Sequence, residues 1–301
     1  MKTPLLVLLA LAASTLASAE TYHVYYLGGQ SNMDGYGYVR ELPADLQSPV
    51  DGVYIFHGNP QPDGVAVGGQ GVWAKLQPGH GVGFSSDGKK NTYSERFGLE
   101  ITLAKHLLEL SPDRKIAFIK YSRGGTSIDE TAARFFGSWE ADFIGGPVAH
   151  GGINQYDHFL ATLRNAFAAS DIDGDGKEDT LVPAGIAWMQ GESDAATARV
   201  ARRYGHNLKR LMDLIRAALR VDDLPIAIGR ISDSGQDDDG RVWNYGNVVR
   251  AAQQDFVDSD VAAALVTSTD DYGHSDPYHY DTAGYIDFGK KFAEALHRLV
   301  E

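Results

Sequence analysis

The sequence predicts an α/β fold in which a parallel sheet of about five strands lies between two layers of helices. Apolar runs rich in β-branched and aromatic residues alternate with amphipathic segments about five times along the chain. Four of the predicted strands are followed by polar motifs that contain glycine or serine. Because alternating strands and helices favour parallel sheets, we expect a three-layer α/β/α architecture.

Each element is justified by its own residues. TYHVYYLGG at 21–29 is β-branched and aromatic and ends in glycines, so it predicts a buried strand and a tight turn. Ser94 is the expected N-cap of the first long helix. Strands are expected at residues 21–29, 115–122, 181–191, 224–232 and 261–269. Helices are expected at residues 94–110, 153–170, 197–220, 247–259 and 282–300.

Residues 43–92 are rich in Gly, Pro, Asn and Asp, and they predict a long irregular region with a short hairpin near Gly52–His57. Aromatic side chains in this region either stack on sugar rings or anchor the loops; they are Tyr54, Phe56, Trp73 and Phe84. The chain has no clean linker and no internal repeat. We therefore expect residues 20–301 to form one domain.

Residues 1–19 have the pattern of a secretory signal. Lys2 supplies a positive charge, Leu5–Ala13 is a short apolar run, and Ala17-Ser18-Ala19 is an A-x-A cleavage site. A membrane anchor is the alternative, but the apolar run is short for a bilayer. We expect a mature chain that begins at Glu20, has no membrane span, and is exported to the periplasm or the medium.

Composition excludes several classes of function. The net charge is −13, which argues against a nucleic acid as partner, because binding its backbone needs clustered Lys and Arg. The chain has no cysteine, so disulfide, thiolate and Cys-zinc chemistry are excluded. A neutral polar substrate such as a sugar raises no electrostatic objection. The oligomeric state stays open.

The four polar motifs at strand ends are the candidates for chemistry. They are GGQSN, SRGGT, MQGESD and DDYGHSDPYH. The carboxyl ends of parallel strands meet at one edge of a sheet, and ligands bind there in open α/β folds. We therefore expect these four segments to converge on one site.

Ser31, in the first motif, stands between a strand and a helix start. Its hydroxyl is a candidate nucleophile if a base removes its proton; the alternative is a helix-capping serine. Asp276 and His279 stand as D-x-x-H in the last motif and can supply that base and its partner. Asp271 and His274 have the same spacing and compete for the role. A polar surface loop and a metal site are further alternatives, although no H-E-x-x-H pattern supports the latter.

An acyl-transfer site also needs hydrogen-bond donors for an oxyanion. The Ser31 N–H, the glycines Gly124 and Gly125, and the side-chain amide of Gln190 are candidates. Glu192 and Asp194 follow Gln190, where they either orient that loop or are solvated. A glycoside hydrolase that uses these two carboxylates is a rival hypothesis.

The segment DIDGDGKED contains the start of a calcium-loop pattern, with Asp171, Asp173 and Asp175 at alternate positions and Gly176 sixth. Position twelve would be Val182, where such a loop needs a bidentate glutamate. An ordinary Asp/Gly turn is therefore favoured over a calcium site.

Four segments together resemble the sequence blocks of carbohydrate acetylesterases of the SGNH-hydrolase superfamily, in the sialate O-acetylesterase-like and acetylxylan esterase-like group. These segments are GGQSNMDG (28–35), GGTS (124–127), WMQGESDA (188–195) and DPYHYDTAG (276–284). The resemblance extends over residues 21–300 and implies a flavodoxin-like parallel sheet.

The resemblance also implies roles for single residues. It implies Ser31 as nucleophile, His279 as base and Asp276 as its partner. The oxyanion hole would comprise the N–H groups of Ser31 and Gly124 and the amide of Gln190, with Gly125 as the alternative to Gly124. The resemblance also implies that Asn32, Gly125 and Glu192 support the site or contact the substrate.

The sequence thus predicts an exported serine esterase that removes O-acetyl groups from carbohydrate without a cofactor. A carbohydrate-binding module that has kept the fold and lost the chemistry is an alternative, as is the glycoside hydrolase. The sugar and the acetyl position stay open.

Overall fold

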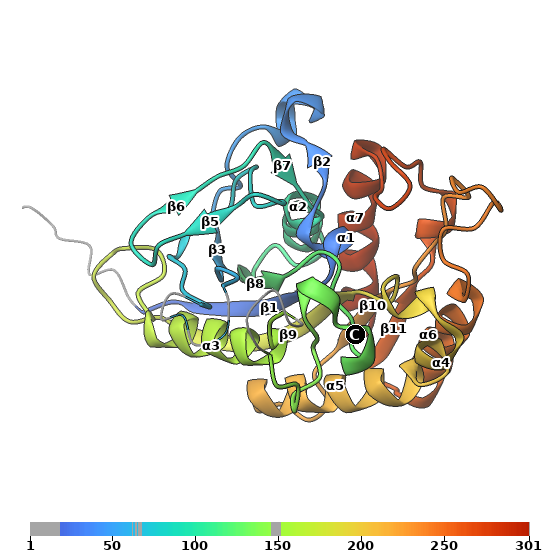
Figure 1. The fold of residues 1–301 in the computed structure, drawn as a ribbon. Coiled ribbons are helices and arrows are strands. Elements are labelled where there is room, and N and C mark those ends of the chain that lie inside the picture. Colours follow the sequence, from blue (N-terminus) through green and yellow to red (C-terminus); the bar gives the residue numbers. More distant parts are fainter. Residues whose placement is uncertain (1–18, 62, 64, 66–67, 146–151, 301) are drawn as a thin grey trace, which may run out of the picture.

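The computed structural model of the chain describes residues 19–61, 63, 65, 68–145 and 152–300 (Figure 1). The predicted signal segment, apart from Ala19, lies outside the described residues. A seven-stranded sheet runs through the centre in the order β11-β10-β9-β1-β8-β3-β4. Its strands are β1 Thr21–Gly29, β3 Val53–His57, β4 Ala74–Lys75, β8 Lys115–Ser122, β9 Thr180–Met189, β10 Ile226–Gly229 and β11 Ala263–Val266.

The five predicted strands are all present and all parallel to their neighbours, which confirms the expected fold class. The segment near Gly52–His57 differs from the prediction. Val53–His57 pairs parallel with β8 on one side and antiparallel with β4 on the other, so it belongs to the central sheet rather than to a separate hairpin. Two small antiparallel pairs lie outside this sheet: β2 (Gly37–Tyr38) with β7 (Arg96–Phe97), and β5 (Ser85–Ser86) with β6 (Asn91–Thr92).

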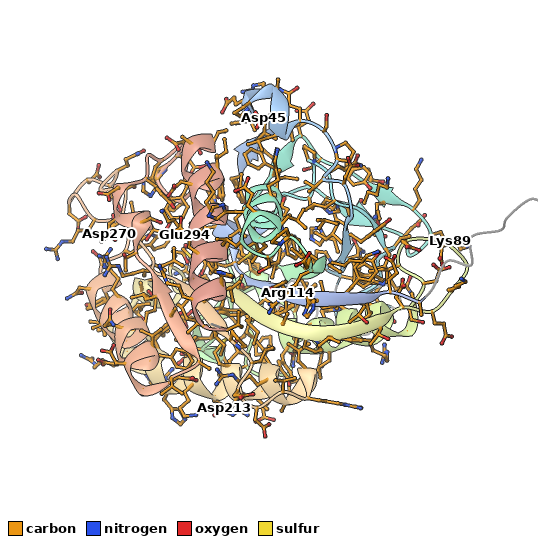
Figure 2. The ribbon with its side chains drawn as sticks, turned by 180° about the vertical axis from the view of Figure 1, so that it is seen from behind. Asp45, Lys89, Arg114, Asp213, Asp270 and Glu294 are labelled. Atoms are coloured by element: carbon orange, nitrogen blue, oxygen red, sulfur yellow. The ribbon has the colours of Figure 1, made fainter. Side chains whose placement is uncertain are left out.

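Helices cover both faces of the sheet. In Figure 1, α2 and α7 lie side by side above it, and α3 and α5 lie below it. The α-helices are α1 Ser31–Asp34, α2 Glu100–Leu110, α3 Gln155–Ala168, α4 Ala198–Ala201, α5 Tyr204–Leu219, α6 Gly246–Ser259 and α7 Thr282–Arg298. Charged side chains such as Asp45, Lys89 and Asp213 project from the periphery (Figure 2). Among the described residues, no helix combines the length and the apolar character needed to cross a bilayer.

Two helix predictions need correction. Ser94 does not cap α2, because residues 96–97 form β7 and the Ser94 hydroxyl accepts a hydrogen bond from the Arg96 N–H at 3.0 Å. The helix begins at Glu100, whose carboxylate accepts from the Gly98 N–H at 3.0 Å. The segment predicted as one helix at 197–220 is two helices, α4 and α5.

The register of the sheet brings the ends of four strands to one level. Gly29 pairs with Ser122 of β8 and with Met189 of β9, and Met189 pairs with Gly229 of β10. A Cβ on Gly29 would lie 1.9 Å from the Met189 carbonyl oxygen, so only glycine fits where β1 turns into α1. The four predicted motifs follow β1, β8, β9 and β11, and Val266 at the end of β11 pairs with Gly229 of β10. The four segments therefore leave the same edge of the sheet, as predicted.

Candidate active site

Ser31 lies at the N-terminus of α1, directly after the central strand β1. The preceding residue is fixed to the sheet, because the Gln30 N–H donates to the Met189 carbonyl at 2.8 Å. The Ser31 side chain is buried but lines a cavity of about 540 Å³. This volume is in the range of small-ligand pockets.

The cavity brings together residues from all four predicted motifs. Its lining comprises Gln30, Ser31, Asp34, Tyr36, Val82, Arg123, Gly124, Gly125, Ala132, Arg134, Phe136, Ser193, Ala196, Trp243, Tyr278 and His279. The convergence of the four segments is therefore confirmed. Ser31 and His279 are far apart in the sequence but line the same cavity.

Asp276 and His279 form a compact pair. The Asp276 Oδ2 atom lies 2.8 Å from His279 Nδ1, and Asp276 Oδ1 accepts from the backbone N–H groups of Tyr278 at 2.8 Å and His279 at 2.9 Å. A proton on Nδ1 is thereby held by the carboxylate, which leaves Nε2 with its lone pair.

The competing pair is arranged differently. The backbone of His274 bridges to Tyr280, and His274 is not among the residues that line the cavity. Within the part of the chain that is described, no hydrogen bond joins Asp271 to His274. The geometry therefore favours Asp276 and His279 over Asp271 and His274.

Tyr36 packs against the imidazole ring of His279. The two rings are stacked, with centroids 3.5 Å apart and planes inclined by 5°. Burial lowers the pKa of His279 below its ordinary value of 6.5, and the hydrogen bond to Asp276 opposes that effect. The lowered pKa favours the neutral form of the His279 imidazole at neutral pH. The sequence reasoning missed Tyr36, although it lies within the segment GYGY just after the first motif.

Ser31 and His279 are not joined by a hydrogen bond among the described residues. Hydrogen bonds between a nucleophile and its base are often long without substrate, and tighten when it binds. The pair is thus near enough to share a cavity but is not locked together.

Gly124 lies against Ser31. A Cβ at Gly124 would come within 3.3 Å of the Ser31 Cβ, whereas a Cβ at Gly125 would meet the ring of Phe136 at 2.5 Å. Gly125 also has a φ of +75°, which favours glycine. Of the two glycines, Gly124 is therefore the one that lies next to Ser31.

Gln190 is fully buried and does not line the cavity. Its side-chain nitrogen donates to Asp194 at 2.5 Å and lies 3.2 Å from the Thr126 carbonyl and 3.3 Å from Gln30 Oε1. Its hydrogens are already engaged. In this structure the amide links three segments, through Gln30, Thr126 and Asp194.

Glu192 and Asp194 are buried, so of the two alternatives a solvated pair does not fit, and a role in orienting the loop does. Burial raises the pKa of each to about 7. Neither lines the cavity. A glycoside hydrolase needs two carboxylates on either side of its substrate, and these two are not placed for that task. Glu192 instead accepts a hydrogen bond from the Asn32 amide at 2.8 Å.

Charged groups also line the cavity beside the nucleophile. Arg123 and Arg134 contribute guanidinium groups, and Asp34 contributes a carboxyl whose pKa is raised to about 6 by burial, against the opposing charges of Lys120 and Arg123. The sequence reasoning missed all three cavity residues. Only their positions within or near the motifs could have indicated them.

The aromatic residues proposed for sugar stacking at 43–92 lie elsewhere. Phe56 and Phe84 are buried, Tyr54 and Trp73 pack against the core, and none of the four lines the cavity. Their role as loop anchors is the interpretation that fits. The aromatic side chains that do line the cavity are Tyr36, Phe136, Trp243 and Tyr278.

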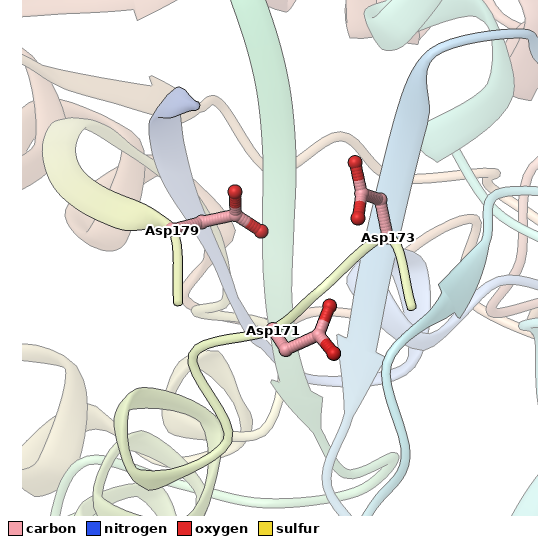
Figure 3. A group of neighbouring side chains, drawn as sticks. All are labelled: Asp171, Asp173 and Asp179. Atoms are coloured by element: carbon pink, nitrogen blue, oxygen red, sulfur yellow. The ribbon is translucent and has the colours of Figure 1, made fainter. Parts of the chain in front are cut away.

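In the acidic loop, the carboxylates that lie close together are those of Asp171, Asp173 and Asp179. Figure 3 shows Asp171, Asp173 and Asp179, whose carboxylate oxygens lie within 4.8 Å of one another. Asp171 accepts from the N–H groups of Gly174 at 2.9 Å and Gly176 at 3.0 Å. Asp175 is outside this group, so the less favoured calcium trio of Asp171, Asp173 and Asp175 is not assembled among the described residues. The carboxylates already hold the turn by hydrogen bonds to its backbone.

The family model described as carbohydrate esterase, sialic acid-specific acetylesterase, matches residues 21–298. The chain belongs to this family. The esterase is thus a carboxylic ester hydrolase that removes O-acetyl groups from carbohydrate, and the resemblance seen in the sequence is confirmed. No curated protein matches its sequence.

Solved structures show the same fold at low sequence identity. A protein from Arabidopsis thaliana is 19% identical to the esterase, with a TM-score of 0.61 over 93% of this chain and 98% of the other. A carbohydrate acetylesterase from Xanthomonas citri is 17% identical, with a TM-score of 0.61 over 92% of this chain and 56% of the other. NanS is 17% identical, with a TM-score of 0.58 over 95% and 99%.

Proposed function

We propose that the esterase works through an acetyl-enzyme on Ser31, with His279 as general base and Asp276 as the partner of His279. The observation that carries this proposal is the cavity that Ser31 and His279 both line, with Asp276 bonded to His279 Nδ1 at 2.8 Å. A weak nucleophile, an oriented base and an orienting carboxylate are the parts that acyl transfer requires.

In the first half of the reaction, His279 Nε2 takes the proton of the Ser31 hydroxyl while Oγ attacks the acetyl carbonyl carbon. The carbonyl π electrons move onto the oxygen, which becomes an oxyanion. When the intermediate collapses, the bond to the sugar oxygen breaks and the sugar leaves with the proton from His279. Asp276 stabilises the imidazolium that forms in between.

In the second half, water replaces the sugar. His279 takes one proton from water as the water oxygen attacks the acetyl carbon. Collapse of the intermediate breaks the bond to Ser31 Oγ, which regains the proton from His279, and releases acetic acid, which gives its remaining proton to solvent and becomes acetate. No other reactant is needed.

The N–H groups of Ser31 and Gly124 are our proposed donors to the oxyanion. The closeness of Gly124 to Ser31 supports this choice over Gly125, whose Cα hydrogen side faces Phe136. Gln190 stays a third candidate from the family resemblance, but its use would require its amide to leave Asp194.

Replacing the nucleophile tests the mechanism. Ser31→Ala is expected to lower kcat for acetate release by roughly 10⁴ or more while the circular dichroism spectrum is unchanged. Ser193→Ala is the matched control, because Ser193 lines the same cavity from another motif. Undiminished acetate release by Ser31→Ala would sink the mechanism. Mass spectrometry of enzyme treated with a serine-directed phosphonate gives a second readout, with the adduct expected on Ser31.

We further propose that the chain is exported and that residues 20–301 form the mature single-domain enzyme. The motif carrying this proposal is the Lys2, Leu5–Ala13 and Ala17-Ser18-Ala19 pattern. N-terminal sequencing of the enzyme from the periplasm or medium of an expressing bacterium is expected to begin at Glu20. Recovery of the uncleaved chain in the cytoplasm alone would contradict export.

A further inference from the structure

A second cavity lies beside the one that holds Ser31. It has a volume of about 420 Å³, and Trp243 lines both cavities. Both volumes are in the range of small-ligand pockets. Trp243 is therefore a wall residue shared by two adjacent cavities.

The loop between β10 and α6, at residues 230–245, forms much of this second cavity and is held in a fixed shape. The Asp233 carboxylate accepts from the backbone N–H groups of Gly235 at 2.9 Å, Val242 at 3.0 Å and Trp243 at 2.7 Å. One side chain thus ties the start of the loop to its end and sets the position of the Trp243 backbone.

The same loop is attached to the segment that carries His279. The Ser234 hydroxyl donates to the Pro277 carbonyl at 2.9 Å, and the ring centroids of Trp243 and Tyr278 are 5.7 Å apart. Tyr278 directly precedes His279 and is about half exposed. The loop that forms the second cavity is therefore in direct contact with the segment that carries the candidate base.

The lining of the second cavity suits a sugar. Asn244 and Asn247 present exposed amides, and Arg241 presents an exposed guanidinium group. Amide and guanidinium groups supply several hydrogen-bond donors and acceptors at fixed angles, as a ring of hydroxyls requires. The face of Trp243 offers an apolar plane against which the C–H face of a sugar ring can pack.

We propose that this second cavity is a subsite for a neighbouring sugar unit of the substrate, so that the esterase acts on acetylated oligosaccharides or polysaccharides rather than on single sugars. The inference rests on the proposed function, since it places the acetylated unit beside Ser31. The adjoining unit of the same glycan chain packs on Trp243 and binds the amides of Asn244 and Asn247.

The test measures kcat/KM for acetate release from chemically O-acetylated xylo- and cello-oligosaccharides of one to four units, each divided by kcat/KM for an aryl acetate. With the wild-type esterase, this ratio is expected to rise by about tenfold when a second sugar unit is added. No rise with length in either series would overturn the subsite.

Asn247→Trp fills the second cavity from the first turn of α6 and is expected to abolish the rise with length. Gln254→Trp is the matched control, because Gln254 is exposed on the same helix and outside both cavities. If Asn247→Trp does not fold, Trp243→Ala removes the shared wall and is expected to lower the same ratio. A wild-type length dependence in a folded variant would contradict the proposal.

The two proposals fail in different ways. Acetate release by Ser31→Ala would overturn the mechanism, but the length dependence of the wild-type enzyme would still report on the second cavity. Loss of the length dependence in the wild-type enzyme, with Ser31→Ala inactive, would overturn the subsite alone.

Discussion

Asn32 connects the candidate nucleophile to the candidate base. Its amide nitrogen donates to Glu192 at 2.8 Å and to the Tyr278 carbonyl at 3.1 Å. Its carbonyl oxygen accepts from the Tyr280 N–H at 3.3 Å and from the Tyr285 hydroxyl at 2.8 Å. Both donors and both acceptor sites are used, and two of the bonds are to the residues on either side of His279. Asn32 is thus a positioning residue.

Asn32→Ala is expected to lower kcat on an aryl acetate while KM changes little, because the His279 segment loses its link to α1. Leaving Glu192 and the Tyr278 carbonyl without this partner is expected to cost about 1–3 kcal/mol of unfolding free energy. Kinetics and chemical denaturation measure the two effects. Asn165→Ala, which breaks a single amide bond to the Gly69 carbonyl, is the control. An unchanged kcat for Asn32→Ala would contradict the positioning role.

His279→Ala is expected to lower kcat by several orders of magnitude, as removal of a catalytic base does, and His274→Ala is expected to have a much smaller effect. The physical reason is that, of these two histidines, His279 lines the cavity that contains Ser31 and His274 does not. Steady-state kinetics on one aryl acetate compares the two variants. The opposite ranking would move the base role to His274.

The pH profile provides a further prediction for His279. Because burial lowers its pKa, the base form persists below the ordinary value of 6.5. The acid limb of kcat/KM is therefore expected to have its midpoint below pH 6.5. A midpoint at or above 6.5, measured with a substrate that does not titrate, would be inconsistent with His279 as the base.

At the scale of elements, the contact between α2 and α7 depends on a glycine. A Cβ at Gly289 of α7 would lie 2.1 Å from Thr102 Oγ1 and 2.3 Å from the Leu99 carbonyl oxygen. The two helices thus approach each other more closely than any side chain would permit. This contact sets the position of the helix that follows the candidate catalytic loop.

Gly289→Ala is expected to destabilise the fold by about 1–3 kcal/mol, because the added methyl group must push the helices apart. Gly205→Ala in α5 is the matched control: the nearest atom to a Cβ there is Ala252 Cβ at 3.4 Å. That substitution is expected to be neutral or to stabilise by up to about 1 kcal/mol, because alanine favours helix. Denaturant unfolding compares them, and a smaller loss for Gly289→Ala than for Gly205→Ala would refute the packing argument.

The elements that the sequence predicted well are those whose signals are local. The β-branched run at 115–122 and the Gly-terminated strand at 21–29 needed no partner to be recognised, and the polar motifs after them indicated the site edge. Val53–His57 was misassigned because its pairing with β8 is set by residues far along the chain. Ser94 has a side chain suited to helix capping, but the residues that follow it pair with β2 as strand β7, so the helix begins only after that strand.

The candidate site was predictable to a similar extent. Ser31, Asp276 and His279 could be proposed from their residue types and spacing, and the structure brings Ser31 and His279 into one cavity. Trp243 and Tyr36 could not be proposed in this way, because the sequence does not distinguish an aromatic residue that faces a cavity from one that faces a core. The burial of Glu192 was also hidden, since a charged residue after a strand is usually solvated.

For the molecule as a whole, buried ionisable groups set the dependence of stability on pH. Burial raises the pKa of Glu192 from 4.5 to about 7, so the folded state keeps a proton that the unfolded chain has lost. Stability from such a group is present below pH 4.5 and is lost as pH rises toward 7. Burial also lowers the pKa of His80 to about 3, so below pH 6.5 the unfolded chain binds a proton that the folded state does not. The free energy of unfolding therefore falls as pH falls below 6.5.

Glu192→Gln is expected to remove the first of these effects. Relative to wild type, the variant is expected to gain up to about 3 kcal/mol of unfolding free energy as pH rises from 4.5 to 7, because the pKa of Glu192 is raised from 4.5 to about 7. Urea unfolding at several pH values measures this difference. Glu178→Gln at an exposed glutamate serves as control, and an equal slope for both variants would contradict the prediction.

The position of β1 in the sheet has a consequence for the order in which the chain is made. β1 is the first strand to leave the ribosome, yet it lies between β8 and β9, so Gly29 finds its neighbours only after Ser122 and then Met189 have been synthesised. Contacts at such sequence separation form slowly. A growing chain can therefore pair β1 on one side once Ser122 has been synthesised, but it completes the centre of the sheet only after Met189.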